Sequence, residues 1–179
     1  MRILRTVLCV VLLAPALVVG GTRMTPDARA LPAAPSDLNI VRAIRRYRVQ
    51  TVRMRQVMGL SSRVRLVRRG NPSARRALVL WRQRVTATRR RFDEGPPHYR
   101  SWMCIHHYEG SWTDPAAPYY GGLQMDISFQ RSYGYVLYRL KGTADHWTPL
   151  EQMWVAEKAY RSGRGFWPWP NTARACGLL

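Results

Sequence analysis

The segment "WMCIHHYEGSW", residues 102–112, is a run of aromatic and apolar residues that contains a single carboxylate, Glu109. Trp102, Ile105 and Glu109 are separated by three and four positions, so they share one face of a helix. Because a buried charge is costly without a partner, a glutamate on an apolar helix face is unusual. The neighbouring sequence indicates what this carboxyl group does.

The residues on either side of this segment predict a helix followed by a loop. "HYRSWMCIHHYEG", residues 98–110, predicts a helix that ends at Gly110. "SWTDPAAPYYGGLQ", residues 111–124, predicts a loop that leads into a tight turn or short strand. Asp126 then has the position of a cap for a short helix that runs through Tyr133.

A further helix is predicted from Thr148 to Gly163. Thr148 is its cap, Pro149 takes the first helical position and Glu151 completes a capping box. The remaining tail is too rich in proline and glycine for a long element. Together these patterns predict a compact, mainly α domain over residues 98–179, with Trp102 and Trp154 in its core.

Residues 31–97 predict a basic helical segment, in the form of a helical hairpin, that ends at "DEGPP", residues 93–97. Residues 31–100 carry 18 basic and 3 acidic residues, whereas residues 101–179 carry 7 and 6. The apolar positions of the first helix recur around Thr51 and stop at Gly59, and those of the second follow the turn "GNPS". They are Ile40, Ile44, Tyr47, Met54 and Met58, then Ala74, Ala77, Leu78, Trp81 and Val85.

The charge of this segment has two interpretations. The arginines of residues 42–91 form a solvated helical face, or they hold the protein on anionic wall polymers or lipid headgroups. Nucleic acid is not the expected partner, because the N-terminus indicates export.

Residues 1–30 predict a signal peptide. "MRILR" supplies the positive start, and an apolar stretch of 16 residues follows, which is shorter than the roughly 20 residues of a spanning helix. The protein is therefore expected to be secreted or in the cell wall; an uncleaved membrane anchor is the alternative. Removal of the signal leaves Cys104 and Cys176, which predicts one disulfide, with two buried free thiols as the alternative.

The place of Glu109 predicts a proton donor. Burial among apolar side chains and the negative end of the helix dipole both favour the protonated form of a carboxyl group. General acid catalysis on a glycosidic oxygen needs such a group, and lysozyme uses a glutamate in an apolar pocket in this way. The alternative is a surface glutamate that caps loop amides.

The motifs "CIHHYEGSW…PYYGGLQMD" and "WTPLEQMWVAEKAY…GRGFWPWPNTARACG" resemble the transglycosylase-like, resuscitation-promoting-factor-type domain of the lysozyme-like superfamily. The resemblance covers about residues 100–179. It implies an α+β lysozyme-like fold, cleavage of peptidoglycan glycan strands, Glu109 as the catalytic acid, a Cys104–Cys176 disulfide and no metal. In the family the cysteine often directly precedes the glutamate, whereas here it lies five residues earlier.

The resemblance also bears on the mechanism. In c-type lysozymes a second carboxylate directly precedes a similar turn, and in this sequence Tyr119 occupies that place. With one carboxyl group, lytic transglycosylation is the expected reaction. Asp114 and Asp126 are the other nearby carboxylates, but Asp114 fits a turn and Asp126 a helix cap. The alternative function is a weakly catalytic or non-catalytic module for cell-wall binding or resuscitation signalling.

Sugar chemistry predicts the substrate contacts, because aromatic faces stack on pyranose rings and amides bond N-acetyl groups. The candidates are Trp112, Tyr119, Tyr120, Gln124 and Trp167, with Gly122 allowing close approach of a strand. Trp167 and Trp169 form a groove wall or cover the core. His106 and Glu109 are three residues apart, but no HExxH motif occurs, so no metal and no cofactor are expected.

Overall fold

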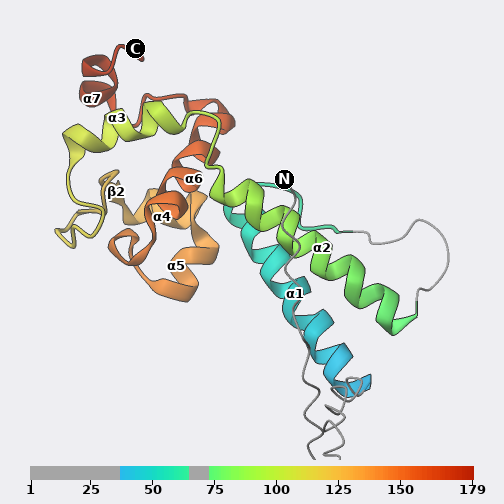
Figure 1. The fold of residues 1–179 in the computed structure, drawn as a ribbon. Helices are drawn as coiled ribbons and strands as arrows, with labels where there is room; N and C mark the ends of the chain where they lie inside the picture. Colours follow the sequence, from blue (N-terminus) through green and yellow to red (C-terminus); the bar gives the residue numbers. More distant parts are fainter. Residues whose placement is uncertain (1–36, 65–72) are drawn as a thin grey trace, which may run out of the picture. The chain divides into compact units, whose positions relative to one another are not determined.

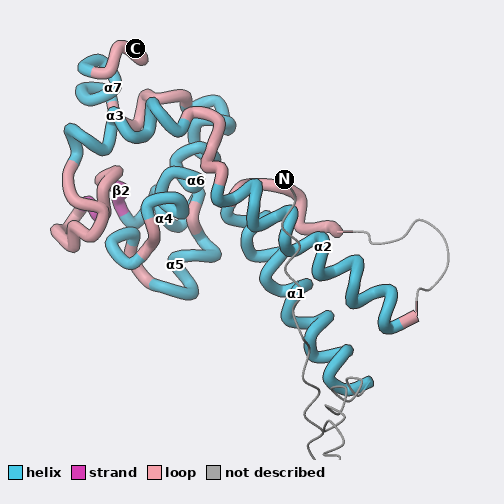
Figure 2. Tube along the Cα trace, viewed as in Figure 1, coloured by secondary structure: helices cyan, strands magenta, loops and turns pink. Residues whose placement is uncertain are grey.

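The computed structural model describes residues 37–64 and 73–179 (Figure 1). These residues are mainly helical, as predicted, and strand is confined to β1 (Tyr119–Tyr120) and β2 (Met125–Asp126) (Figure 2). The predicted signal peptide or anchor, residues 1–30, lies outside the described residues. Within the described ranges, the helices are all too short or too polar to cross a membrane.

Both helices predicted in the basic segment are present. α1 spans Asp37–Val57 and α2 spans Ala74–Asp93, and the two pack along each other in the same direction (Figure 1). The predicted hairpin, in which the helices would run antiparallel, is therefore wrong, because Met58 and Phe92 bring the C-terminal ends of both helices into one core. Gly59 follows α1 with a φ of +67°, a left-handed conformation that glycine adopts without strain. Ser73 caps α2 by accepting a hydrogen bond from the backbone N–H of Arg76.

Five further α-helices follow, and local sequence signals account for most of their ends. Asp126 caps α4 and Gly134 closes it, while Thr148 and Glu151 form the predicted capping box of α6. A π-helical turn, Tyr160–Arg164, follows α6, and Gly163 lies in it with a φ of +97°. The helices are α3 (Tyr99–Glu109), α4 (Ile127–Tyr133), α5 (Tyr135–Lys141), α6 (Pro149–Ala159) and α7 (Pro170–Ala175).

One hydrophobic core joins the basic segment to the C-terminal helices. Trp102 and Trp154 are buried in it, as predicted, at 0% and 4% exposure. Met58 and Phe92, from the ends of the two basic-segment helices, belong to the same core, and Trp154 Nε1 donates to the Phe92 carbonyl at 3.1 Å. Residues 35–179 accordingly group into one unit.

A buried carboxylate ties α3 to α6. Glu157, on α6, is 1% exposed, and its Oε2 accepts a hydrogen bond from Trp102 Nε1 at 3.0 Å. His98 Nδ1 lies 3.1 Å from the same oxygen, and Arg161 Nε lies 3.9 Å from Oε1. A buried carboxylate is tolerated only with such partners, so these contacts fix α3 against α6.

Replacement of this carboxylate is expected to destabilise the fold. Glu157→Ala leaves the buried Trp102 N–H without an acceptor and should lower the free energy of unfolding by about 3 kcal/mol. Glu94→Ala, which removes a 65%-exposed carboxylate paired with Arg90, should change it by less than about 0.5 kcal/mol. Urea unfolding followed by circular dichroism measures both, and equal losses would contradict this role of Glu157.

Candidate functional site

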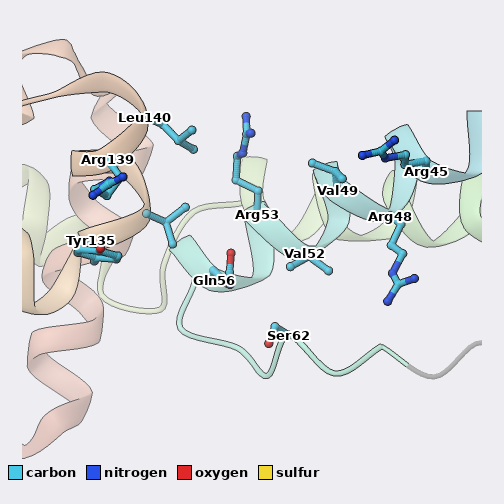
Figure 3. Close-up of a pocket in the computed structure, with 11 residues that line it drawn as sticks. Arg45, Arg48, Val49, Val52, Arg53, Gln56, Ser62, Tyr135, Arg139 and Leu140 are labelled. Carbon is cyan, nitrogen blue, oxygen red and sulfur yellow. The ribbon is translucent and has the colours of Figure 1, made fainter. Parts of the chain in front are cut away.

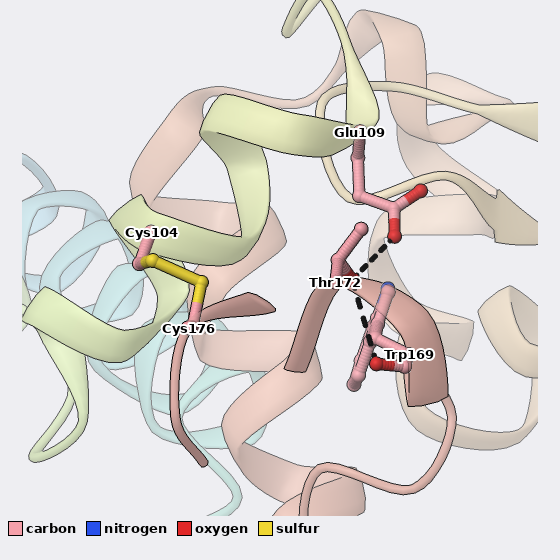
Figure 4. Close-up of a disulfide and its surroundings, with 5 residues drawn as sticks. All are labelled: Cys104, Glu109, Trp169, Thr172 and Cys176. Atoms are coloured by element: carbon pink, nitrogen blue, oxygen red, sulfur yellow. Dashed lines mark hydrogen bonds between the residues drawn. A yellow bond between two sulfur atoms is a disulfide. The ribbon is translucent and has the colours of Figure 1, made fainter. Parts of the chain in front are cut away.

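Glu109 is the last residue of α3, and its carboxyl group meets α7 (Figure 4). The side chain is half-buried, and its Oε1 accepts a hydrogen bond from Thr172 Oγ1 at 2.7 Å. Among the described residues, Oε2 has no hydrogen-bond partner. One oxygen is therefore held in place and the other is left for a ligand.

A disulfide fixes α7 beside this carboxyl group. Cys104 lies on α3, and its bond to Cys176, just after α7, confirms the predicted pairing (Figure 4). The two Cα atoms are 6.0 Å apart, within the usual range for a disulfide. Because Thr172 is on the helix that this bond ties to α3, its hydroxyl stays within reach of Glu109.

Two adjoining hollows lie beside α3 and α7, and Glu109 lines the first of them. The first, of about 210 Å³, also has Pro170 and Asn171 in its lining. The second, of about 230 Å³, extends to Asp126, Ser128 and Arg164. Because both are lined by the same four residues, they form one groove; the shared residues are Tyr119, Gln124, Pro168 and Trp169.

Aromatic side chains form part of this groove. Tyr119, at 50% exposure, offers its ring to solvent. Trp169 is only 4% exposed, and its Nε1 donates to the Leu123 carbonyl at 2.6 Å. Trp169 packs edge-on against Trp102 and Phe129, at centroid distances of 5.1 and 5.4 Å. The groove thus has one exposed aromatic ring on its rim and one fixed ring at its base.

Gln124 presents an acceptor to the groove from a constrained backbone. Its φ is +45°, a left-handed conformation that is uncommon for a residue with a side chain and is typical of functional sites. Its Nε2 donates to Asp114 Oδ2 at 2.9 Å and to the Gly121 carbonyl at 3.0 Å. The amide oxygen is thereby left as the group available to a ligand.

The other two carboxylates considered from the sequence have structural partners. Asp114 Oδ1 accepts the Ala116 N–H at 3.0 Å, so this side chain holds the predicted turn and lines neither hollow. Asp126 caps α4, as predicted, through the Phe129 N–H at 2.7 Å. Glu109 is therefore the one carboxylate in the lining of the first hollow.

Three predicted substrate contacts lie in the packing that supports the loop. Trp112 stacks on His106 with ring centroids 3.8 Å apart, and His106 Nδ1 lies 3.0 Å from the Gly122 carbonyl. A Cβ on Gly122 would lie 2.6 Å from His106 Nδ1 and 2.7 Å from Trp112, so this position requires glycine. Tyr120 is half-buried against the core.

Neither hollow has Trp112, Tyr120, Gly122 or Trp167 in its lining, whereas Tyr119 and Gln124 line both. Trp167 is 64% exposed. Substrate contact by these four residues therefore stays a prediction.

The carbonyl of Trp112 accepts a hydrogen bond from Gln152 Nε2 at 2.8 Å, which connects the loop to α6.

Sequence reasoning missed Thr172, Asn171 and Arg164 as site residues. Each lies in or near the proline-rich tail, where no helical periodicity distinguishes a residue that faces the site from one that does not. Only the folding of this tail across α3 brings them to the groove. No cluster of three or more metal-ligating side chains is found within residues 37–64 and 73–179.

Comparison with known protein families, curated proteins and solved structures gives no match for this chain. The resemblance to the transglycosylase-like domain therefore stays a prediction from the motifs.

The cap at the groove makes stability depend on pH. The Phe129 N–H and the Ser128 hydroxyl, both donating to Oδ1, hold the pKa of Asp126 below its usual 3.8. The charged carboxylate thus stabilises the fold above pH 3.8, and this contribution is lost as the pH falls through the lower pKa of the folded state.

We therefore expect Asp126→Ala to lower the free energy of unfolding by about 1 kcal/mol at pH 7. The deficit relative to wild type should shrink as the pH is lowered below 3.8, because the wild-type cap becomes protonated too. Urea unfolding over a series of pH values measures it. A deficit that stays constant well below pH 3.8 would contradict the role of the charged cap.

Proposed function

We propose that this protein cleaves the glycan strands of peptidoglycan as a lytic transglycosylase, with Glu109 as its catalytic residue. The main support is the half-buried carboxyl group of Glu109, with one oxygen held by Thr172, at the end of a groove with aromatic residues in its lining. A secreted or wall-associated location follows from the predicted export signal.

The groove offers the groups that an N-acetylated sugar strand needs. The exposed ring of Tyr119 can stack on a pyranose face, and the amide oxygen of Gln124 can accept an N-acetyl N–H. Asn171 adds a second amide beside Glu109. Arg164, at the other end of the groove, can pair with a carboxylate of the stem peptide or of a muramyl residue without one.

The reaction needs one carboxyl group in two protonation states. Glu109 Oε2 donates its proton to the bridging oxygen as the bond from that oxygen to the anomeric carbon breaks. The muramyl C6 hydroxyl then attacks the anomeric carbon and gives its proton to the Glu109 carboxylate. The products are a 1,6-anhydro ring and a free hydroxyl on the leaving sugar, and Glu109 is protonated again.

Thr172 acts on this chemistry as a positioning residue. Its hydroxyl donates a hydrogen bond to Oε1 of Glu109, which leaves Oε2 as the oxygen that can face the substrate. The scarcity of carboxylates supports transglycosylation over hydrolysis, since Asp126, in the adjoining hollow, is engaged in capping α4.

Mass analysis of muropeptides tests the proposal. Purified peptidoglycan incubated with wild-type protein should yield 1,6-anhydromuramyl ends, and Glu109→Gln should abolish them. Thr172→Val should reduce the rate by about 10- to 100-fold, whereas Thr172→Ser, which keeps the hydroxyl, should stay near wild type. Glu94→Gln, on an exposed carboxylate outside the groove, is the matched control.

Three outcomes separate the alternatives. Reducing muramic acid without anhydro ends would indicate hydrolysis. Equal products from wild type and Glu109→Gln would contradict the catalytic role. Binding of insoluble peptidoglycan with no cleavage by any form would favour a wall-binding or signalling module.

A further inference from the structure

A separate hollow of about 810 Å³ lies between α1 and α5 (Figure 3). It shares no lining residue with the groove at Glu109. Its volume is within the range of ligand-binding clefts. Its lining combines arginines with exposed apolar side chains.

The first kind is unpaired arginine. Arg45, Arg48 and Arg53 of α1 and Arg139 of α5 line the hollow, and all four are exposed. No carboxylate is in the lining, and no described residue forms an ion pair with any of the four. The residues outside the described ranges contain a single acidic side chain, Asp27, so at most one of these arginines can be neutralised by it.

The second kind is exposed apolar side chain. Val49, Tyr135 and Leu140 line the hollow at 50%, 56% and 52% exposure, and Val52 lies beside them. Figure 3 shows the arginines of α1 extending to both sides of the valines. Ile40 and Met54 of α1 are buried, whereas Val49 is exposed. α1 therefore has two apolar faces.

We propose that this α1–α5 hollow is a docking site for the surface of a lipid bilayer that contains anionic phospholipids. The arginines pair with lipid phosphates, and the valine, leucine and tyrosine side chains enter the boundary between headgroups and acyl chains. A hydrophilic polyanion would satisfy the arginines but leave the apolar side chains in water, so the lining favours a lipid surface over a wall polymer.

Co-sedimentation with vesicles tests the proposal. The full chain should bind vesicles of phosphatidylglycerol mixed with phosphatidylcholine, at about physiological salt, more tightly than vesicles of phosphatidylcholine alone. Arg45→Gln with Arg48→Gln should weaken this binding by about fivefold for each arginine removed. Arg75→Gln with Arg82→Gln removes the same charge from exposed positions of α2 outside the hollow, and should have a much smaller effect.

The apolar contribution is tested with Val49→Ser combined with Leu140→Ser. Both side chains are half exposed, so the fold should persist, with circular dichroism as the check. Vesicle binding should fall, whereas binding of soluble polyphosphate should stay unchanged. Because every variant carries the same residues 1–36, the N-terminal segment contributes equally to all.

A bimane label reports whether the hollow itself meets the bilayer. In a Cys9→Ser background, the label on Val49→Cys should shift to shorter wavelength on anionic vesicles, and a label on Ala87→Cys of α2 should not. If the two double arginine variants lose vesicle binding equally, net charge alone explains the binding, and the proposal is overturned. Unchanged vesicle binding by the serine variant, with tight polyphosphate binding, would indicate a polyanion contact instead and also overturn it.

Discussion

The site depends on the buried indole of Trp169, which lies where α3, α4 and the turn between β1 and β2 meet. Its N–H is bonded to the Leu123 carbonyl, and its ring packs between Trp102 and Phe129. An unpaired buried N–H costs about 1–3 kcal/mol, so this acceptor selects one orientation of the ring. Thr172, three residues later, then reaches Glu109. The packing of Trp169 thus places both the ring at the base of the groove and the Thr172 hydroxyl that donates to Glu109.

The basic segment is part of the same fold rather than a separate attachment. Met58 and Phe92 enter the C-terminal core, and the guanidinium group of Arg161 donates to the Met58 carbonyl. One face of α1 therefore packs on α2, and another lines the open hollow beside α5. If both proposals hold, glycan cleavage and lipid contact are carried out by a single folded unit, with the enzyme groove and the docking site on different helices.

Local signals were sufficient to predict much of this structure. Helix caps such as Asp126 and Thr148 depend on hydrogen bonds within a few residues, so sequence spacing identifies them. The disulfide was predicted from the two cysteines that remain once the predicted signal peptide is set aside, and the placement of Glu109 was predicted from helical spacing on α3. Contacts between distant segments could not be predicted in this way. The pairing of Thr172 with Glu109 spans 63 residues, and nothing in the local pattern of the tail distinguishes that threonine. Trp167 and Trp169 look alike in the sequence, yet one is exposed and the other buried, because only Trp169 faces the core.

Nuclear magnetic resonance can show whether a glycan strand occupies the groove at Glu109. Soluble N-acetylglucosamine–N-acetylmuramic acid oligosaccharides are titrated into ¹⁵N-labelled Glu109→Gln protein, which is expected to bind them without turnover. Backbone amide signals of Tyr119, Gln124 and Asn171 should shift together with a single affinity, because these residues line the hollow that contains Glu109. Signals that stay in place there, while others move or none do, would contradict the proposed site.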